Sequence, residues 1–93
     1  MNSAQAAFQR FSEWKKEATP LKLTMDNPDG TENSKWRGEL FSVHEVEKTV
    51  EFMVENTRDV MPLIDLEDAD FVVMAELVEI TRPDGRRLVF EVA

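Results

Sequence analysis

Asn27-Pro28-Asp29-Gly30 and Arg82-Pro83-Asp84-Gly85 repeat one turn sequence at two places in the chain. Pro fixes φ at the first central position of a turn, Asp accepts hydrogen bonds from the backbone that follows, and Gly adopts the left-handed conformation that closes the turn. Each tetrapeptide therefore predicts a β-hairpin. Most of the β-forming sequence lies between the two turns, so we expect a mainly β fold.

The sequence around the turns alternates between apolar and polar residues, which is the period of a half-buried strand. Leu21, Leu23 and Met25 alternate with polar residues before the first turn, and Leu88 and Phe90 share one face after the second. Followed along the chain, this pattern predicts strands at 21–26, 36–44, 49–55, 60–66, 71–81 and 86–92.

The β stretch in the middle of the chain contains an irregularity. Phe41 and Val43 share one parity, whereas Val50 and Phe52 share the other. Because side chains alternate strictly along a regular strand, we expect a bend, bulge or short turn near residues 44–48. Further on, an acidic segment at 66–70 is expected to form a single helical turn.

The first part of the chain has the spacing of an amphipathic helix, with apolar residues at intervals of three and four. Ser3 is the expected N-cap, and Thr19-Pro20 ends the helix because Pro disfavours helical geometry in the residue before it. We therefore expect a helix over residues 3–18. Its aromatic residues are interpreted as core, with a docking face for a partner as the alternative: Phe8, Phe11 and Trp14.

The composition indicates one acidic globular domain over residues 1–93. It carries 19 acidic and 11 basic side chains, a net charge of −8, and no Cys. The charge repels phosphate backbones, so nucleic-acid binding needs a local basic patch. The absence of Cys excludes disulfides and thiolate metal sites. No apolar run is long enough to span a membrane and no basic leader is present, so we expect a soluble cytoplasmic protein.

Two stretches carry a resemblance to a known family. Residues 38–44, Gly-Glu-Leu-Phe-Ser-Val-His, look like the glycine-containing second strand of the Sm-like (Lsm) barrel running into a bend. Residues 60–73 lead from one apolar strand through acidic residues into another, and they are also similar to the end of the C-terminal barrel of bacterial ribosome maturation factors. The resemblance implies a bent, five-stranded antiparallel barrel with an N-terminal helix. An extra C-terminal hairpin at 78–92 is expected beyond that fold.

The resemblance also implies assembly, because Sm-like barrels leave edge strands that pair between copies. A homo-oligomeric ring is expected, with an interface formed by Val60, Pro62, Ile64, Phe71 and Val73. The uridine pocket of the RNA-binding members is not implied. Residues 44–48 lack the family's Asn, and residues 65–68 lack its Arg-Gly pair.

Two groups of basic residues are candidates for nucleic-acid binding. Lys35 and Arg37 flank Trp36, and cations beside an aromatic ring can stack a base and hold a phosphate. The second turn adds arginines, so the expected surface comprises Lys35, Trp36, Arg37, Arg82, Arg86 and Arg87. The alternative is that the arginines pair with the abundant carboxylates and that the Trp is half-buried in the barrel.

We expect no catalysis, no metal and no cofactor. His44 is the only His and has no nucleophile or second ligand in register. The acidic residues 65–70 lack the Gly and the distal Glu of an EF-hand loop. A PilZ-like barrel is a lower-ranked alternative, because the Asp/Asn-x-Ser-x-x-Gly motif is absent.

Two functions of different classes remain open. The first is a homo-oligomeric Sm-like binding or scaffold module without catalytic activity, for which RNA is a candidate ligand. The second is an acidic protein-interaction module with no role in nucleic-acid binding. The C-terminal hairpin with its three arginines is the expected location of whatever is particular to this protein.

Overall fold

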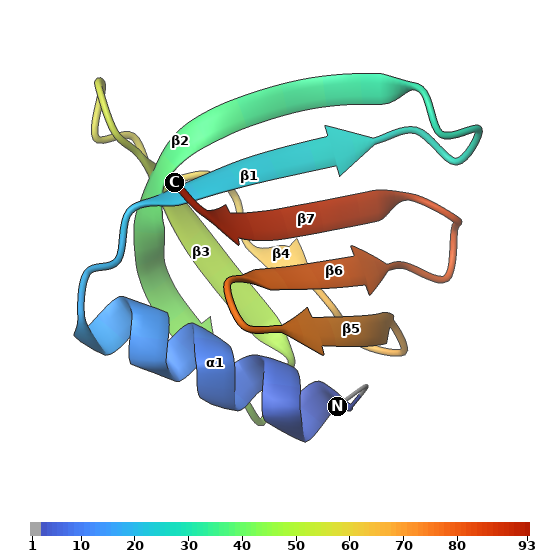
Figure 1. Cartoon of the computed structure of the whole chain (residues 1–93), viewed down its shortest axis with the longest axis horizontal. Coiled ribbons are helices and arrows are strands. Elements are labelled where there is room, and N and C mark those ends of the chain that lie inside the picture. The colour runs from blue at the N-terminus through green and yellow to red at the C-terminus, as the bar shows by residue number, and fades with distance from the viewer. Residues whose placement is uncertain (1–2) are drawn as a thin grey trace.

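The computed structural model describes residues 3–93, apart from the side chains of residues 32 and 33. The described residues form one helix and a single antiparallel sheet of seven strands in the order β4-β3-β2-β1-β7-β6-β5 (Figure 1). The mainly β prediction is confirmed. The elements are α1 (Ala4–Lys16), β1 (Leu21–Asp26), β2 (Glu32–His44), β3 (Thr49–Val54), β4 (Ile64–Asp65), β5 (Asp70–Met74), β6 (Leu77–Thr81) and β7 (Arg87–Val92).

The two Pro-Asp-Gly turns have the same internal geometry. In each turn the Gly N–H donates to the carbonyl of the first residue at 2.9 Å, and the Asp carboxylate accepts from the N–H two residues on at 2.9 Å. Gly30 and Gly85 adopt φ values of 86° and 89°, the left-handed region that favours glycine. In the first turn, the N–H of Thr31, followed by its hydroxyl, lowers the pKa of the Asp29 carboxyl below its ordinary value of 3.8.

The two turns also touch each other. The first joins β1 to β2, the second joins β6 to β7, and β1 pairs with β7, so both turns lie at the same end of the sheet (Figure 1). A Cβ on Gly85 would lie 3.2 Å from the Cβ of Pro28. The predicted hairpins are therefore neighbours in space, which the sequence alone did not indicate.

Strand β2 bends at Gly38. Its first half pairs with β1 and its second half with β3, and Gly38 takes part in both ladders. A Cβ at this position would overlap the carbonyl oxygen of Met53, so only glycine lets β3 approach so closely. A β-bulge at Phe41 and Ser42 follows, and both residues oppose Glu51. Because of the bulge, Leu40 and Val43 both face the core while Phe41 is exposed. The expected turn follows at 45–48 and pairs Val43 with Val50, which accounts for the parity change between these two residues.

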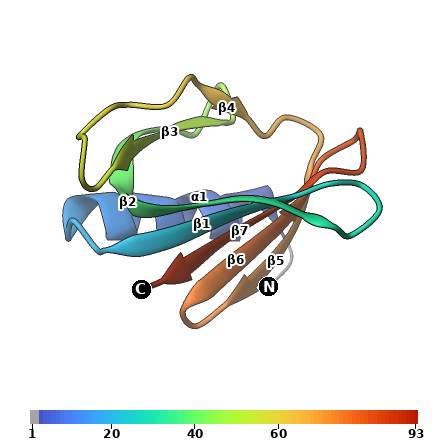
Figure 2. The ribbon, with the colours of Figure 1, turned by 90° about the horizontal axis from the view of Figure 1, so that it is seen from above.

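Helix α1 packs on the inner, concave face of the curved sheet, against β2 and β5 (Figure 2). Ser3 is the N-cap, because its Oγ accepts a hydrogen bond from the N–H of Ala6 at 3.1 Å. The aromatic face of α1 is buried, which confirms its interpretation as core. Ring centroids lie 5.2 Å apart between Phe11 and Phe90, and 6.2 Å apart between Phe8 and Phe71.

Three strands differ from the sequence prediction. Strand β2 begins at Glu32, four residues before the expected start at residue 36. The single strand expected at 71–81 is the hairpin β5–β6, which turns at residues 75–76. Inward-facing residues change parity between Val73 and Val78, and this change accompanies the turn. The strand expected at 60–66 is reduced to β4 and one isolated bridge at Val60, because Pro62 offers no backbone N–H to the ladder.

Candidate anion-binding surface on β1 and β2

The outer face of the sheet, turned away from α1, carries a group of cations on β1 and β2. The register places Lys22 directly opposite Arg37, and Lys35 lies two residues before Arg37 on the same strand. Residues opposite each other on an antiparallel ladder point to the same side, so these three cations share the outer face. Trp36 lies opposite Leu23 and points inward, where it is half-buried against the core.

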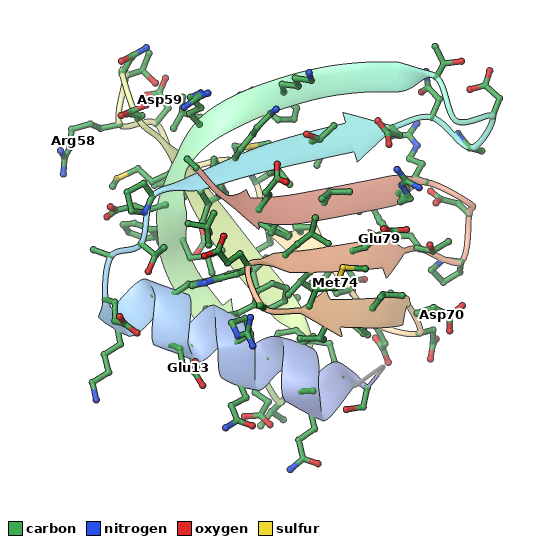
Figure 3. All side chains as sticks on the ribbon, in the orientation of Figure 1. Glu13, Arg58, Asp59, Asp70, Met74 and Glu79 are labelled. Atoms are coloured by element: carbon green, nitrogen blue, oxygen red, sulfur yellow. The ribbon has the colours of Figure 1, made fainter. Side chains whose placement is uncertain are left out.

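A fourth cation comes from the loop after β3. The N–H of Arg58 donates to the carbonyl of Val54 at 2.8 Å, and the N–H of Glu55 donates to the carbonyl of Arg37 at 2.8 Å, so the loop is tied to β2. Arg58 has a left-handed φ of 59°. Figure 3 shows Arg58 and Asp59 projecting from this loop beyond the sheet. We call the four cations the β2 cationic strip: Lys22, Lys35, Arg37 and Arg58.

Two hollows adjoin along the strip, and both are lined by Arg37. The first has a volume of about 360 Å³ and is lined by Lys22, Lys35, Trp36 and Arg37. The second, of about 380 Å³, lies where β1 begins, β2 bends and β3 ends. Its charged lining residues are Arg37, Arg58, Glu39 and Glu55, and its apolar ones include Leu21 and Met53. Gly38 also lines this second hollow.

The guanidinium groups of the strip belong to Arg37 and Arg58. Among the described residues, neither Arg37 nor Arg58 takes part in an ion pair. Guanidinium groups bind carboxylates and phosphates through paired hydrogen bonds. Arg37 and Arg58 can therefore bind an anionic ligand without first breaking an ion pair among the described residues.

Two of the three arginines of the C-terminal hairpin, Arg86 and Arg87, are paired with carboxylates. Arg87 pairs through Nη2 with Asp26 and through Nη1 with Glu79, at 3.4 Å in each case. Arg86 is paired within its own turn, with its Nε 3.9 Å from a carboxylate oxygen of Asp84. These pairs neutralise much of the positive charge that the sequence indicated at the second turn. They correspond to the alternative of internal pairing that the sequence left open.

The structure thus brings together only part of the predicted nucleic-acid surface. Lys35, Trp36 and Arg37 lie side by side, whereas Arg82, Arg86 and Arg87 lie at and beside the turn between β6 and β7. Two members of the strip, Lys22 and Arg58, are not among the residues predicted from the sequence. Counting residues outward from the first turn pairs Lys22 with Arg37 across the hairpin, so the sequence could have indicated Lys22. Arg58 left no such signal, because its position depends on the path of β3.

The residues expected at an oligomer interface divide into two groups. Ile64 and Phe71 are buried in the core of the chain itself, and Val73 is partly buried against that core. Val60 and Pro62 are exposed. The buried residues face inward with α1 and can therefore contribute only backbone groups to pairing between copies.

The remaining candidates from the sequence are His44 and the acidic segment at 66–70. No group of three or more His, Cys, Asp or Glu side chains among the described residues is placed to hold a metal ion. His44 is exposed at the end of β2. The acidic segment forms a turn at 67–68 in place of the expected helical turn, and the Asp65 carboxylate accepts from the N–H of Glu67 at 2.9 Å.

The fold and this surface define a small, mainly β protein with an open cationic surface on an otherwise acidic molecule. The described residues contain no helix long and apolar enough to cross a membrane. Comparisons with protein families, with curated proteins and with solved structures found no match for this chain.

Proposed function

We propose that this protein is a non-catalytic binding module that takes single-stranded nucleic acid, in particular RNA, along the β2 cationic strip. The observation that carries the proposal is the position of Arg37, which lines both adjoining hollows and has no internal ion-pair partner among the described residues. Successive phosphates of one strand can occupy the two hollows. Lys22, Lys35 and Arg58 then supply the further contacts.

The chemistry of the strip suits a flexible polyanion. Arg37 and Arg58 can each donate two parallel hydrogen bonds to the oxygens of a phosphate, while the lysines act as point charges. Trp36 also lines the first hollow, although its side chain is turned to the inner face and packs against the core. The net charge of −8 opposes a polyanion over the rest of the surface, so binding is expected to be weak and strongly dependent on salt.

We further propose that the module is a divergent relative of the Sm-like barrels. Supporting features are the N-terminal helix on the concave face and the strong bend of β2 at Gly38. The hairpin β5–β6 extends the sheet beyond the five strands of that fold. Since β4 and β5 do not pair with each other in the described residues, the sheet stays open with α1 against its concave face.

Salt dependence is the direct test of the proposed ligand. A fluorescently labelled single-stranded RNA of about 10 nucleotides is expected to bind at low salt, and log affinity should fall with log salt concentration. With four cations on phosphates the slope is about −3 or shallower. Fluorescence anisotropy measures both quantities. A lack of binding at about 20 mM salt, or a slope near zero, would reject the proposal.

A second function is favoured by the other half of the outer face. Phe41 is 50% exposed at the bulge and Leu63 is 58% exposed before β4, with the carboxylates of Glu39 and Glu51 nearby on the same face. Such a surface suits a basic, partly apolar protein segment. A peptide that alternates Leu and Arg distinguishes the two functions. If it binds at about 150 mM salt while RNA binds at no salt concentration, the protein-interaction function is the correct one.

A further inference from the structure

The sheet has three stretches of free edge in the described residues, and two of them are protected against pairing. The first half of β2 pairs only with β1, but it is flanked on the outer face by Lys35 and Arg37. Charged side chains on an edge discourage pairing with another strand. Strand β4 is only two residues long and follows Pro62. Neither stretch is suited to pairing between molecules.

Strand β5 is the least protected of the three edges, although α1 packs beside it and Arg10 donates to the carbonyls of Met74 and Ala75 at its end. It pairs with β6 alone and reads Asp-Phe-Val-Val-Met over residues 70–74, with one charge, no Pro, no Lys and no bulge. Its outer face is apolar up to the margin, since Val72 is 38% and Met74 is 52% exposed. Leu77 lies beside Met74 on the next strand. Apolar, β-branched edge strands of this kind associate when no device blocks them.

A groove of about 340 Å³ runs between α1 and the end of β5, and it is lined by Ala6, Gln9, Arg10, Glu13, Val73, Met74 and Ala75. Arg10 lies at one end of the groove, where its Nη1 donates to the carbonyls of Met74 and Ala75. Figure 1 shows β5 as the last strand of the sheet, with α1 beside it. Ala6 contributes the smallest side chain on the helix side of this groove.

We infer that two copies of this chain pair through β5, strand to strand and antiparallel, about a two-fold axis at Val72. In this register all five residues of β5 are paired: Val72 meets its own copy, Phe71 meets Val73 of the other copy, and Asp70 meets Met74 of the other copy. No two like charges face each other, so the edge is complementary to itself. The outer-face patch of Val72, Met74 and Leu77 becomes continuous across the two molecules.

This arrangement differs from the ring that the sequence led us to expect. A ring joins two different edges, and β4 offers only two residues at the opposite margin of the sheet. A two-fold pair uses one edge twice and stops at two copies. Because five paired residues and a few apolar side chains bury about 1,200 Å² or less, the dissociation constant is expected in the micromolar range or weaker. The pairing is independent of the proposed nucleic-acid binding, since β2 and β5 are separated by β1, β7 and β6.

Sedimentation equilibrium from about 10 μM to about 1 mM tests the pairing. The protein is expected to approach the mass of two chains at the upper end. V72K places two ammonium groups side by side at the axis and should raise the dissociation constant about tenfold or more. Circular dichroism of V72K confirms that the fold is kept. A single-chain mass at all concentrations, a mass above two chains, or an unchanged constant for V72K would overturn the inference.

Two matched variants test the register. M74K places an ammonium opposite Asp70 of the other copy, and M74D places a carboxylate there. Both remove the same methionine, so its lost contacts cancel in the comparison. Since each dimer contains the contact twice, M74K is expected to associate about tenfold more tightly than M74D. Equal association by the two variants would contradict this register.

Discussion

Phe90→Ala is expected to leave the protein largely unfolded at room temperature. Phe90 is fully buried on β7 at the centre of the sheet, with its ring 5.2 Å from that of Phe11 and 6.3 Å from that of Phe52. Its ring contacts connect α1 with β3, which lies beyond the bend in β2. Removing a buried Phe costs about 3–5 kcal/mol, and a chain of this length has little stability beyond that. Urea denaturation followed by circular dichroism measures the loss.

Phe41→Ala is the matched control, because it removes the same atoms from the surface. Phe41 is 50% exposed at the β-bulge and lies outside the core cluster. Its replacement should change the free energy of unfolding by no more than about 0.5 kcal/mol. Similar losses for the two variants would mean that the core is not where the structure places it.

Gly38→Ala is expected to destabilise the protein by about 3 kcal/mol, the upper end of typical overpacking costs. The added Cβ would overlap the backbone carbonyl of Met53 and lie 3.0 Å from Cε2 of Phe52. Backbone atoms cannot turn away as a side chain can, so β2 and β3 must separate at the bend. The second hollow, which Gly38 lines, would change shape as well.

Gly30→Ala provides the comparison for backbone conformation without overlap. Gly30 has a φ of 86°, and a Cβ there would have no neighbour within 4 Å. Only the left-handed strain remains, and that costs about 1 kcal/mol. The same denaturation experiment separates the two effects. If Gly30→Ala were as damaging as Gly38→Ala, close approach at the bend would not be the reason that β2 needs glycine there.

Much of the fold follows from local sequence signals. The two Pro-Asp-Gly turns, the helix with its Ser3 cap and the strand β1 occur where the sequence predicts them, because each depends on neighbouring residues. The sequence predicts one strand in place of the hairpin β5–β6, because residues 75–76 contain neither Gly nor Pro. Only the change of parity between Val73 and Val78 signalled the turn.

The candidate site was predictable to a smaller extent. Lys35, Trp36 and Arg37 are adjacent in sequence, so their clustering needed no knowledge of the fold. Arg87 was expected on the same surface, but β7 lies beside β1 and brings it against Asp26. Arg58 joins the strip only because the loop after β3 is tied to β2. Strand order decides both outcomes, and strand order depends on contacts between distant residues.

Amide NMR spectra recorded during a titration with single-stranded RNA locate the bound ligand on the protein. We expect the largest shifts at the amides of Lys22, Lys35, Arg37 and Arg58. The paired arginines of the second turn, Arg86 and Arg87, should shift little. Shifts concentrated at that turn, or no shifts at low salt, would contradict RNA binding along the β2 cationic strip.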